Sequence, residues 1–176
     1  MTVIALFGAT GKTGHRVLTR ALAAGIEVRA LVCDPAKLAT TSPALAVIRG
    51  DVLDSAAVDQ TVAGSNAVLS LCGGGLSAPL DRSGPVDRVI RFVLKTPTGR
   101  VLADADQHLR MLKASGPEWT VVRGPRLTET PGTATYRVGW VGVDANTQIS
   151  RDDLADFILT PAKDRTFVGQ MPFISA

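Results

Sequence analysis

Residues 3–14 read Val-Ile-Ala-Leu-Phe-Gly-Ala-Thr-Gly-Lys-Thr-Gly, an apolar run that leads directly into glycines at positions 8, 11 and 14. In such a pattern Gly8 allows a tight turn out of a strand, and Gly11 lets the main chain approach a pyrophosphate closely. Gly14 lets the following helix pack against the sheet, and that helix offers free N–H groups and the positive end of its dipole to an anion. The stretch therefore predicts a strand, a phosphate-binding turn and a helix.

The helix after the turn is supported by apolar residues that recur at helical spacing and by a glycine at the expected end. These are Val17, Leu18, Ala21 and Leu22, followed by Gly25. A purely structural glycine turn is the alternative interpretation, but the flanking strand and helix favour ligand binding.

A nucleoside-triphosphate loop is a second alternative, because Gly11-Lys12-Thr13 resembles the end of a P-loop. That motif requires a glycine five residues before its Gly-Lys pair, and the residue there is Leu6. The P-loop interpretation is therefore excluded.

Strand and helix signals alternate along the chain, which predicts an α/β fold with a parallel sheet covered on both faces. The strands are expected at 27–32, 46–49, 67–71 and 119–122, with a last one within 166–174. Further helices are expected at 55–62, 85–95, 101–114 and 151–159, and a short turn or helix after Asp34. Residues 135–143 and 148–149 look like a hairpin or flap joined by 144–146, and Ser150 with Asp153 predicts a capping box.

Composition limits the class of protein. A chain of 176 residues that is 45% hydrophobic is expected to form one globular domain over 1–176. It has no apolar run of the roughly 18 residues that a membrane span needs, and no signal-peptide pattern, so we expect a cytoplasmic protein. The net charge of +3 comes from scattered residues, which argues against a nucleic-acid partner. No metal site is predicted.

The two cysteines, Cys33 and Cys72, fall near the ends of strands that are expected to flank the first strand. Two strand spacings separate such positions by roughly 10 Å, which is too far for a disulfide. We therefore predict free thiols.

Five segments resemble, in the same order, the atypical short-chain dehydrogenase/reductases of the NmrA-like type, near the flavin reductase/biliverdin reductase B group. They are "LFGATGKTG" (6–14), "VIRGDVLD" (47–54), "WTVVRGPRLT" (119–128), "TYRVG" (135–139) and "ISRDDLADFIL" (149–159). The resemblance implies a doubly wound Rossmann-type fold that holds NADP or NAD across the strand ends.

Carried over by position, the resemblance assigns a set of cofactor contacts. It places Gly8, Thr10, Gly11, Lys12 and Thr13 on the pyrophosphate. Asp51 and Val52 would lie on the adenine, and Cys72 and Gly73 near the nicotinamide ribose.

The chain departs from these relatives in two ways that bear on the fold and the cofactor. Residues 67–75 pass from the fourth strand directly into a segment that follows the fifth strand in relatives. A βα unit of about 30 residues is therefore missing, and the sheet is expected to be one strand short. The usual arginine after the second strand is Cys33. Asp34 could then bind a ribose hydroxyl, as in NAD sites, whereas Lys12 and Lys37 could serve a 2′-phosphate; we favour NADP over NAD.

The family's catalytic Tyr/Lys pair is absent, because the residue four positions after Tyr136 is Trp140. Tyr136 is better explained as a flap or packing residue. Cys72 and His108 are the candidate catalytic residues, although a buried thiol and a surface histidine are the simpler interpretations.

Three further basic residues are candidate ligand contacts. Arg123 and Arg126 leave an expected strand at the end where ligands bind, so either a substrate-binding role or surface solvation is possible. His15, directly after Gly14, would either contact the cofactor phosphate or face solvent.

Without an obvious acid, hydride transfer is easiest to an acceptor that hardly needs a proton, such as a flavin, a quinone or a linear tetrapyrrole. We therefore expect an NAD(P)H-dependent oxidoreductase that acts on a small planar molecule. The alternatives are a non-catalytic NAD(P)-binding sensor of the NmrA-like type and a shortened relative that binds cofactor poorly.

Overall fold

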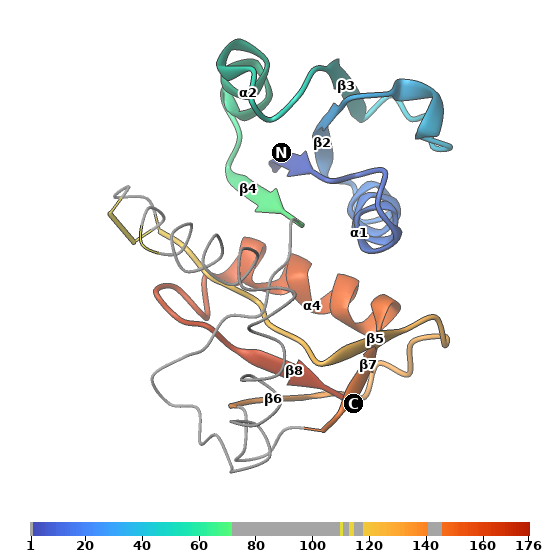
Figure 1. Ribbon diagram of the computed structural model, residues 1–176, viewed down its shortest axis with the longest axis vertical. Coiled ribbons are helices and arrows are strands. Elements are labelled where there is room, and N and C mark those ends of the chain that lie inside the picture. Colours follow the sequence, from blue (N-terminus) through green and yellow to red (C-terminus); the bar gives the residue numbers. More distant parts are fainter. Residues whose placement is uncertain (1, 72–109, 111–112, 115–117, 141–145) are drawn as a thin grey trace, which may run out of the picture. The chain divides into compact units, whose positions relative to one another are not determined.

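The computed structural model describes residues 2–71, 110, 113–114, 118–140 and 146–176 (Figure 1). The chain divides into two compact units. The first contains Met1–Cys72 and Leu154–Lys163, and the second contains Gly73–Asp153 and Asp164–Ala176.

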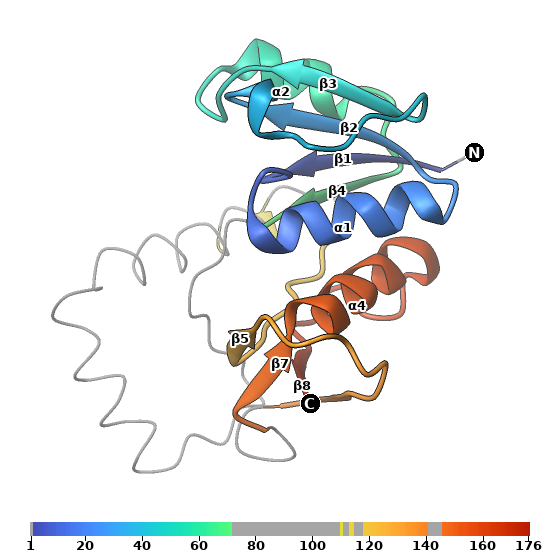
Figure 2. The ribbon, with the colours of Figure 1, turned by 90° about the vertical axis from the view of Figure 1, so that its right-hand side faces the viewer.

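The first unit is built on a parallel four-stranded sheet with the order β3-β2-β1-β4 (Figure 2). The strands are β1 (Val3–Phe7), β2 (Glu27–Val32), β3 (Leu45–Arg49) and β4 (Ala67–Ser70). The prediction that strands 27–32 and 67–71 flank the first strand is confirmed. The strand order reverses at β1, and in open α/β sheets ligands bind beside the carboxyl ends of the strands at such a point.

Helices cover both faces of this sheet. Figure 1 shows α1 (Lys12–Ala23) and α2 (Ser55–Val62) on opposite sides. Helix α1 buries Val17, Leu18 and Ala21, and it ends just before Gly25, whose φ of +71° suits glycine. On the α2 face, the core cluster contains Ala5, Phe7, Leu31 and Ala57. The strands are therefore apolar on both faces, as a covered parallel sheet requires.

Helix α4 (Arg151–Asp164) extends beyond the predicted end at residue 159 and contains Pro161. It contributes buried apolar side chains from Leu154, Phe157 and Ile158. A short 3₁₀ helix, η1 (Pro35–Lys37), begins at Asp34 as predicted.

The second unit contains two small sheets. Strand β5 (Arg126–Thr128) pairs in parallel with β7 (Gln148–Ser150), and β6 (Arg137–Gly139) pairs antiparallel with β8 (Phe173–Ser175). Of the two forms expected for 135–143 and 148–149, the hairpin is wrong, because the described parts of its two arms pair with different strands. The flap stays a prediction.

The predicted strand at 119–122 is also only partly formed. Thr120 and Arg123 make isolated parallel bridges to Gln170 and Phe173 of the C-terminal tail. Residues 119–122 are half-buried.

Several predictions lie outside the described residues. These are the helix at 85–95, most of the helix at 101–114, the Gly-rich stretch 72–75 and residues 144–145 of the joint, so the missing strand stays a prediction. In the part of the chain that the structure describes, no helix is long and apolar enough to cross a membrane.

Candidate functional site

The turn between β1 and α1 has a geometry that only glycine permits at two positions. Gly8 has a φ of +84°, in the left-handed region, and its carbonyl oxygen accepts a hydrogen bond from the Gly11 amide at 3.0 Å. A β-carbon at position 14 would lie 1.9 Å from the same Gly8 oxygen. The chain therefore folds back on itself tightly, and the start of α1 lies against the end of β1.

The first turn of α1 is electrostatically unbalanced. Its N-cap residue, Gly11, has no side chain to accept a hydrogen bond, and the first turn contains no acidic residue. Lys12, His15 and Arg16 instead place cationic or titratable groups at the positive end of the helix dipole. An anion bound to these amides would offset the repulsion, so the first turn suits a phosphate group.

A cavity of about 210 Å³ opens at the carboxyl ends of β1, β2 and β3. It is lined by residues that directly follow these strands and by the ends of the strands themselves: Gly8, Thr10, Leu31, Val32, Cys33, Asp34, Lys37, Gly50 and Val52. The lining joins the glycine turn to the residues after β2 and β3 in one continuous surface.

Two carboxylates lie where the chain leaves β2 and β3. The Asp51 Oδ2 atom accepts a hydrogen bond from the Cys33 thiol at 3.6 Å, and its Oδ1 accepts one from the Leu53 amide at 2.9 Å. Asp34 caps η1, because its Oδ1 accepts a hydrogen bond from the Ala36 amide at 3.1 Å. Cys33 is exposed and is a free thiol, as predicted.

The structure brings together most of the predicted cofactor contacts that it describes. Gly8, Thr10, Asp34 and Val52 line one cavity. Asp51 is hydrogen-bonded to Cys33, which is also a lining residue. Gly11, Lys12 and Thr13 follow in the adjoining turn and helix start. Leu31, Val32 and Gly50 also line the cavity and were not predicted from the sequence. Their positions at the ends of predicted parallel strands were the signal that could have identified them.

The predicted catalytic residues Cys72 and His108, and Gly73 near the nicotinamide ribose, lie outside the described residues. Their roles stay predictions.

The two candidate substrate-binding arginines have different surroundings in the second unit. Arg123 is buried, its Nε donates to the Met171 carbonyl at 2.9 Å, and its guanidinium lies 5.7 Å from the centre of the Phe173 ring. Arg126 is exposed at the start of β5. A substrate-binding role stays a prediction for both, and the exposed Arg126 is the more accessible of the two.

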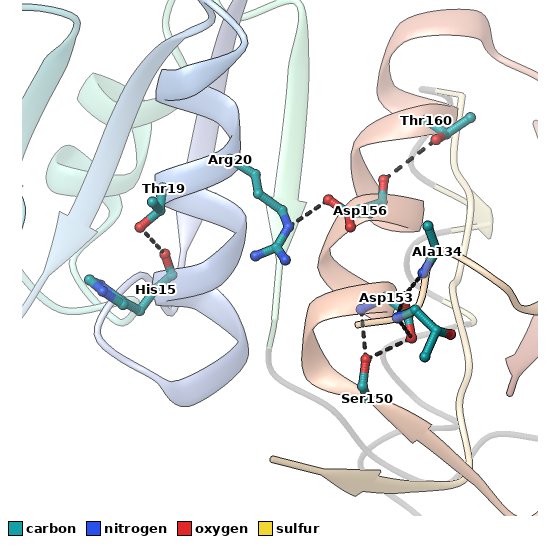
Figure 3. Close-up of polar contacts among 9 residues, drawn as sticks. His15, Thr19, Arg20, Ala134, Ser150, Asp153, Asp156 and Thr160 are labelled. Atoms are coloured by element: carbon teal, nitrogen blue, oxygen red, sulfur yellow. Dashed lines mark hydrogen bonds and ion pairs between the residues drawn. The ribbon is translucent and has the colours of Figure 1, made fainter. Parts of the chain in front are cut away.

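A buried acidic residue at the start of α4 holds a loop in place (Figure 3). The Asp153 amide donates to Ser150 Oγ at 2.9 Å, and that hydroxyl donates to Asp153 Oδ2 at 2.8 Å, so the predicted cap is formed. The Asp153 Oδ1 also accepts hydrogen bonds from the amides of Thr133 and Ala134. From the sequence, Asp153 is expected only at the helix start, so its contacts with residues 133 and 134 were not predicted.

The larger hollow in the first unit, about 370 Å³, lies away from the strand ends. It is bounded by the C-terminal end of α1 and by α4, including Arg20 and Asp156, which form an ion pair at 2.5 Å (Figure 3). The Gly8–Thr10 turn does not line it. We therefore regard the smaller cavity as the candidate functional site.

The sequence matches a family model described as NAD(P)H-binding over residues 8–94 and 80–165. Those two stretches together span most of the chain, including the glycine turn and the residues after β2 and β3.

Solved structures share the fold over nearly the whole chain. An anaerobillin reductase from Escherichia coli O157:H7 is 20% identical, with a TM-score of 0.77 and coverage of 99% of this chain and 97% of its own. A short-chain dehydrogenase/reductase (wide type) from Veillonella parvula DSM 2008, in complex with NADP, is 15% identical, with a TM-score of 0.76 and coverage of 99% and 94%. A proposed NADH-flavin reductase from Streptococcus pneumoniae TIGR4 is 17% identical, with a TM-score of 0.70 and coverage of 99% of each chain. These likenesses confirm the Rossmann-type α/β fold.

Proposed function

The chain belongs to the NAD(P)H-binding family, and from this premise we propose that it is an NAD(P)H-dependent oxidoreductase that passes hydride to a small, planar, oxidised acceptor. The observation that carries the proposal is the uncapped first turn of α1 next to the Gly8 turn, with cations and no acid at its positive end. That arrangement is stabilised when a diphosphate binds to the exposed amides.

The residues present fit the cofactor. A side chain at Gly14 would collide with the turn, and the glycines at 8 and 11 leave the main chain open for a pyrophosphate. Thr10, Lys12 and Thr13 would contact the same group. At the other end of the cavity, Asp34, Asp51 and Val52 would hold the adenosine half.

Val52 and Leu53 are exposed apolar side chains, 57% and 92% accessible, after the end of β3. Val52 lines the cavity and offers an apolar surface to a flat adenine ring. When bound, the reduced nicotinamide supplies a hydride to the acceptor. The chain's own part is to bind and orient the cofactor so that the two reacting molecules meet.

The chemistry of the acceptor follows from the missing Tyr/Lys pair. With Trp140 four residues after Tyr136, the family's usual proton donor is not formed. Flavins, quinones and tetrapyrroles accept hydride with little need of a proton during transfer. Two similar structures are an anaerobillin reductase and a proposed NADH-flavin reductase, and both names favour reduction of a small acceptor. Arg126, Arg123, Cys72 and His108 remain the proposed substrate-side residues.

A non-catalytic NAD(P)-binding sensor is the second candidate function. The absence of the Tyr/Lys pair favours it, because a protein that only binds the dinucleotide needs no proton donor. The glycine turn serves both functions equally.

One experiment separates the two candidates. Purified protein is titrated with NADH and NADPH while nicotinamide fluorescence is followed, and then FMN, a quinone and biliverdin are added in turn while nicotinamide absorbance is recorded. Saturable binding followed by oxidation with at least one acceptor is the expected result. Binding without oxidation would identify a sensor, and absence of binding by both coenzymes would reject both functions.

A further inference from the structure

We propose that the cavity at the end of β2 selects a coenzyme with a free 2′-hydroxyl, NAD(H), over one with a 2′-phosphate, NADP(H). This inference rests on the proposed cofactor binding. It reverses the preference that the sequence favoured, because the structure adds the cavity lining and the hydrogen bonds of Asp51 to what the sequence shows at positions 33 and 34.

The first observation concerns the residue directly after β2. Cys33 follows Val32, is exposed, and lines the cavity. An arginine at this position would offer a planar guanidinium that binds a phosphate through two parallel hydrogen bonds. A thiol offers neither charge nor such geometry, so the position most suited to recognise a 2′-phosphate lacks a cation.

The second observation is a negative charge next to Cys33. The Cys33 thiol donates to Asp51 Oδ2 at 3.6 Å, and the Leu53 amide holds the other oxygen of that carboxylate at 2.9 Å. Asp51 is therefore oriented toward residue 33 by two hydrogen bonds. A 2′-phosphate bound next to Cys33 would meet this carboxylate as a like charge.

The third observation is a carboxylate that can accept a hydrogen bond from a ribose hydroxyl. Asp34 lines the cavity, and its Oδ1 is engaged by the Ala36 amide. Among the described residues, no group donates a hydrogen bond to its Oδ2. An acidic residue about 20 positions beyond the glycines binds the ribose hydroxyls in NAD sites.

Among the described residues, Lys37 is the one cation that lines the cavity. Lys12, at the start of α1, and Arg49, at the end of β3, are not among the lining residues. A single flexible lysine acts as a point charge and loses more side-chain freedom on binding than a guanidinium fork does. Two carboxylates, Asp34 and Asp51, surround the same position, so we expect a hydroxyl to bind there better than a phosphate.

The test compares equilibrium binding of NADH and NADPH by fluorescence titration, and of ADP-ribose and 2′-phospho-ADP-ribose by calorimetry. The second pair lacks nicotinamide, so its readout is independent of any activity. We expect the form without phosphate to bind about tenfold more tightly or better in each pair, the effect of roughly one lost charged contact. Equal or tighter binding of the phosphorylated form would overturn the inference and leave the proposed function intact. Failure of all four ligands to bind would reject the proposed function itself.

Variants locate the preference. Cys33→Arg is expected to tighten NADPH binding about tenfold or more, because it supplies a guanidinium group that can bind the 2′-phosphate through two hydrogen bonds. Asp34→Asn is expected to narrow the NADH preference through the loss of the carboxylate. Asp59→Asn, an exposed acid on α2 away from the cavity, changes net charge by the same amount and serves as the matched control. If Asp59→Asn shifted the preference as much as Asp34→Asn, net charge rather than the site would be responsible, and the inference would be wrong.

Discussion

Gly14 and Gly8 determine how closely α1 approaches β1: a β-carbon on Gly14 would lie 1.9 Å from the Gly8 carbonyl oxygen and 2.7 Å from its carbonyl carbon. Both atoms belong to the backbone, so no side chain can move aside to make room. The pair explains why the turn requires glycine at a position where the helix itself would favour alanine.

Gly14→Ala is therefore expected to destabilise the protein by about 2 kcal/mol or more and to weaken NADH and NADPH binding, because the start of α1 must move away from the turn. Urea unfolding and fluorescence titration measure the two effects. Gly25→Ala is the control at the other end of α1, where φ is +71° and no atom lies within 4 Å of the added carbon. It should lose about 1 kcal/mol through backbone strain and keep its affinity for the cofactor. Equal loss of affinity in both variants would contradict the role given to the turn.

Gly11→Asp should separate stability from binding. Aspartate is a favoured N-cap residue, so the free energy of unfolding is expected to stay within about 1 kcal/mol of the wild type. The new carboxylate would occupy the place of the diphosphate and repel it, so both coenzymes should bind at least about tenfold more weakly.

Gly11→Asn is the matched control for the aspartate variant, since asparagine caps the helix equally well without charge. It should lose less affinity than the aspartate. Unchanged affinity in Gly11→Asp would remove the assignment of the phosphate site.

The turn after β1 and the start of α4, which local sequence determines, were predicted correctly. The turn after β1 depends on glycines and apolar residues within one short stretch, and the Ser150–Asp153 cap joins residues three positions apart. The hairpin expected near 135–149 failed for the opposite reason. An extended pattern predicts a strand but does not identify its partner, and the partner of β6 is β8, near the C-terminus.

The candidate site shows the same limit. The resemblance assigned Gly8 and Val52 to one cofactor, and Asp34 was a candidate for its ribose; the three residues line one cavity because parallel strands bring their carboxyl ends to one edge. The bond between Cys33 and Asp51 could not be predicted, since it depends on how two loops approach each other.

Asp153→Asn is expected to cost about 2–4 kcal/mol of stability. The Asp153 side chain is 1% exposed and accepts hydrogen bonds from Ser150 and from the amides of Thr133 and Ala134. An amide group cannot accept all of these bonds, and the donors left without a partner would be buried. Asp156→Asn on the same helix breaks only the exposed ion pair with Arg20 and should cost less than about 1 kcal/mol. Thermal unfolding of both variants would measure the difference, and equal costs would contradict the role of burial.

Asp164, at the end of α4, is expected to make the stability of the fold depend slightly on pH. Hydrogen bonds from the Thr166 side chain and from its backbone amide lower the pKa of Asp164 below its usual value of 3.8. A carboxylate with a lowered folded-state pKa stabilises the fold above the unfolded pKa, and this contribution is lost as pH falls through the folded value. Asp164→Asn should therefore flatten the acid side of the stability curve below about pH 4, as measured by thermal unfolding between pH 2 and 6. An acid side unchanged from that of the wild type would rule out this carboxylate as a contributor.

Cys33 offers a direct chemical test of where the coenzyme binds. Its thiol is exposed and lines the cavity, so it should react readily with N-ethylmaleimide in the free protein. If the adenosine half occupies the cavity, a coenzyme at ten times its Kd leaves about one molecule in eleven free, and labelling should slow about tenfold. Trypsin cleaves after Arg29 and Lys37, so mass spectrometry of peptide 30–37 reports on Cys33 separately from Cys72. The Gly11→Asp variant, with its affinity weakened tenfold, is about half occupied at the same coenzyme concentration, so it should label at about half the rate of the free protein or faster. A wild-type labelling rate that saturating coenzyme leaves unchanged would place the adenosine elsewhere on the protein.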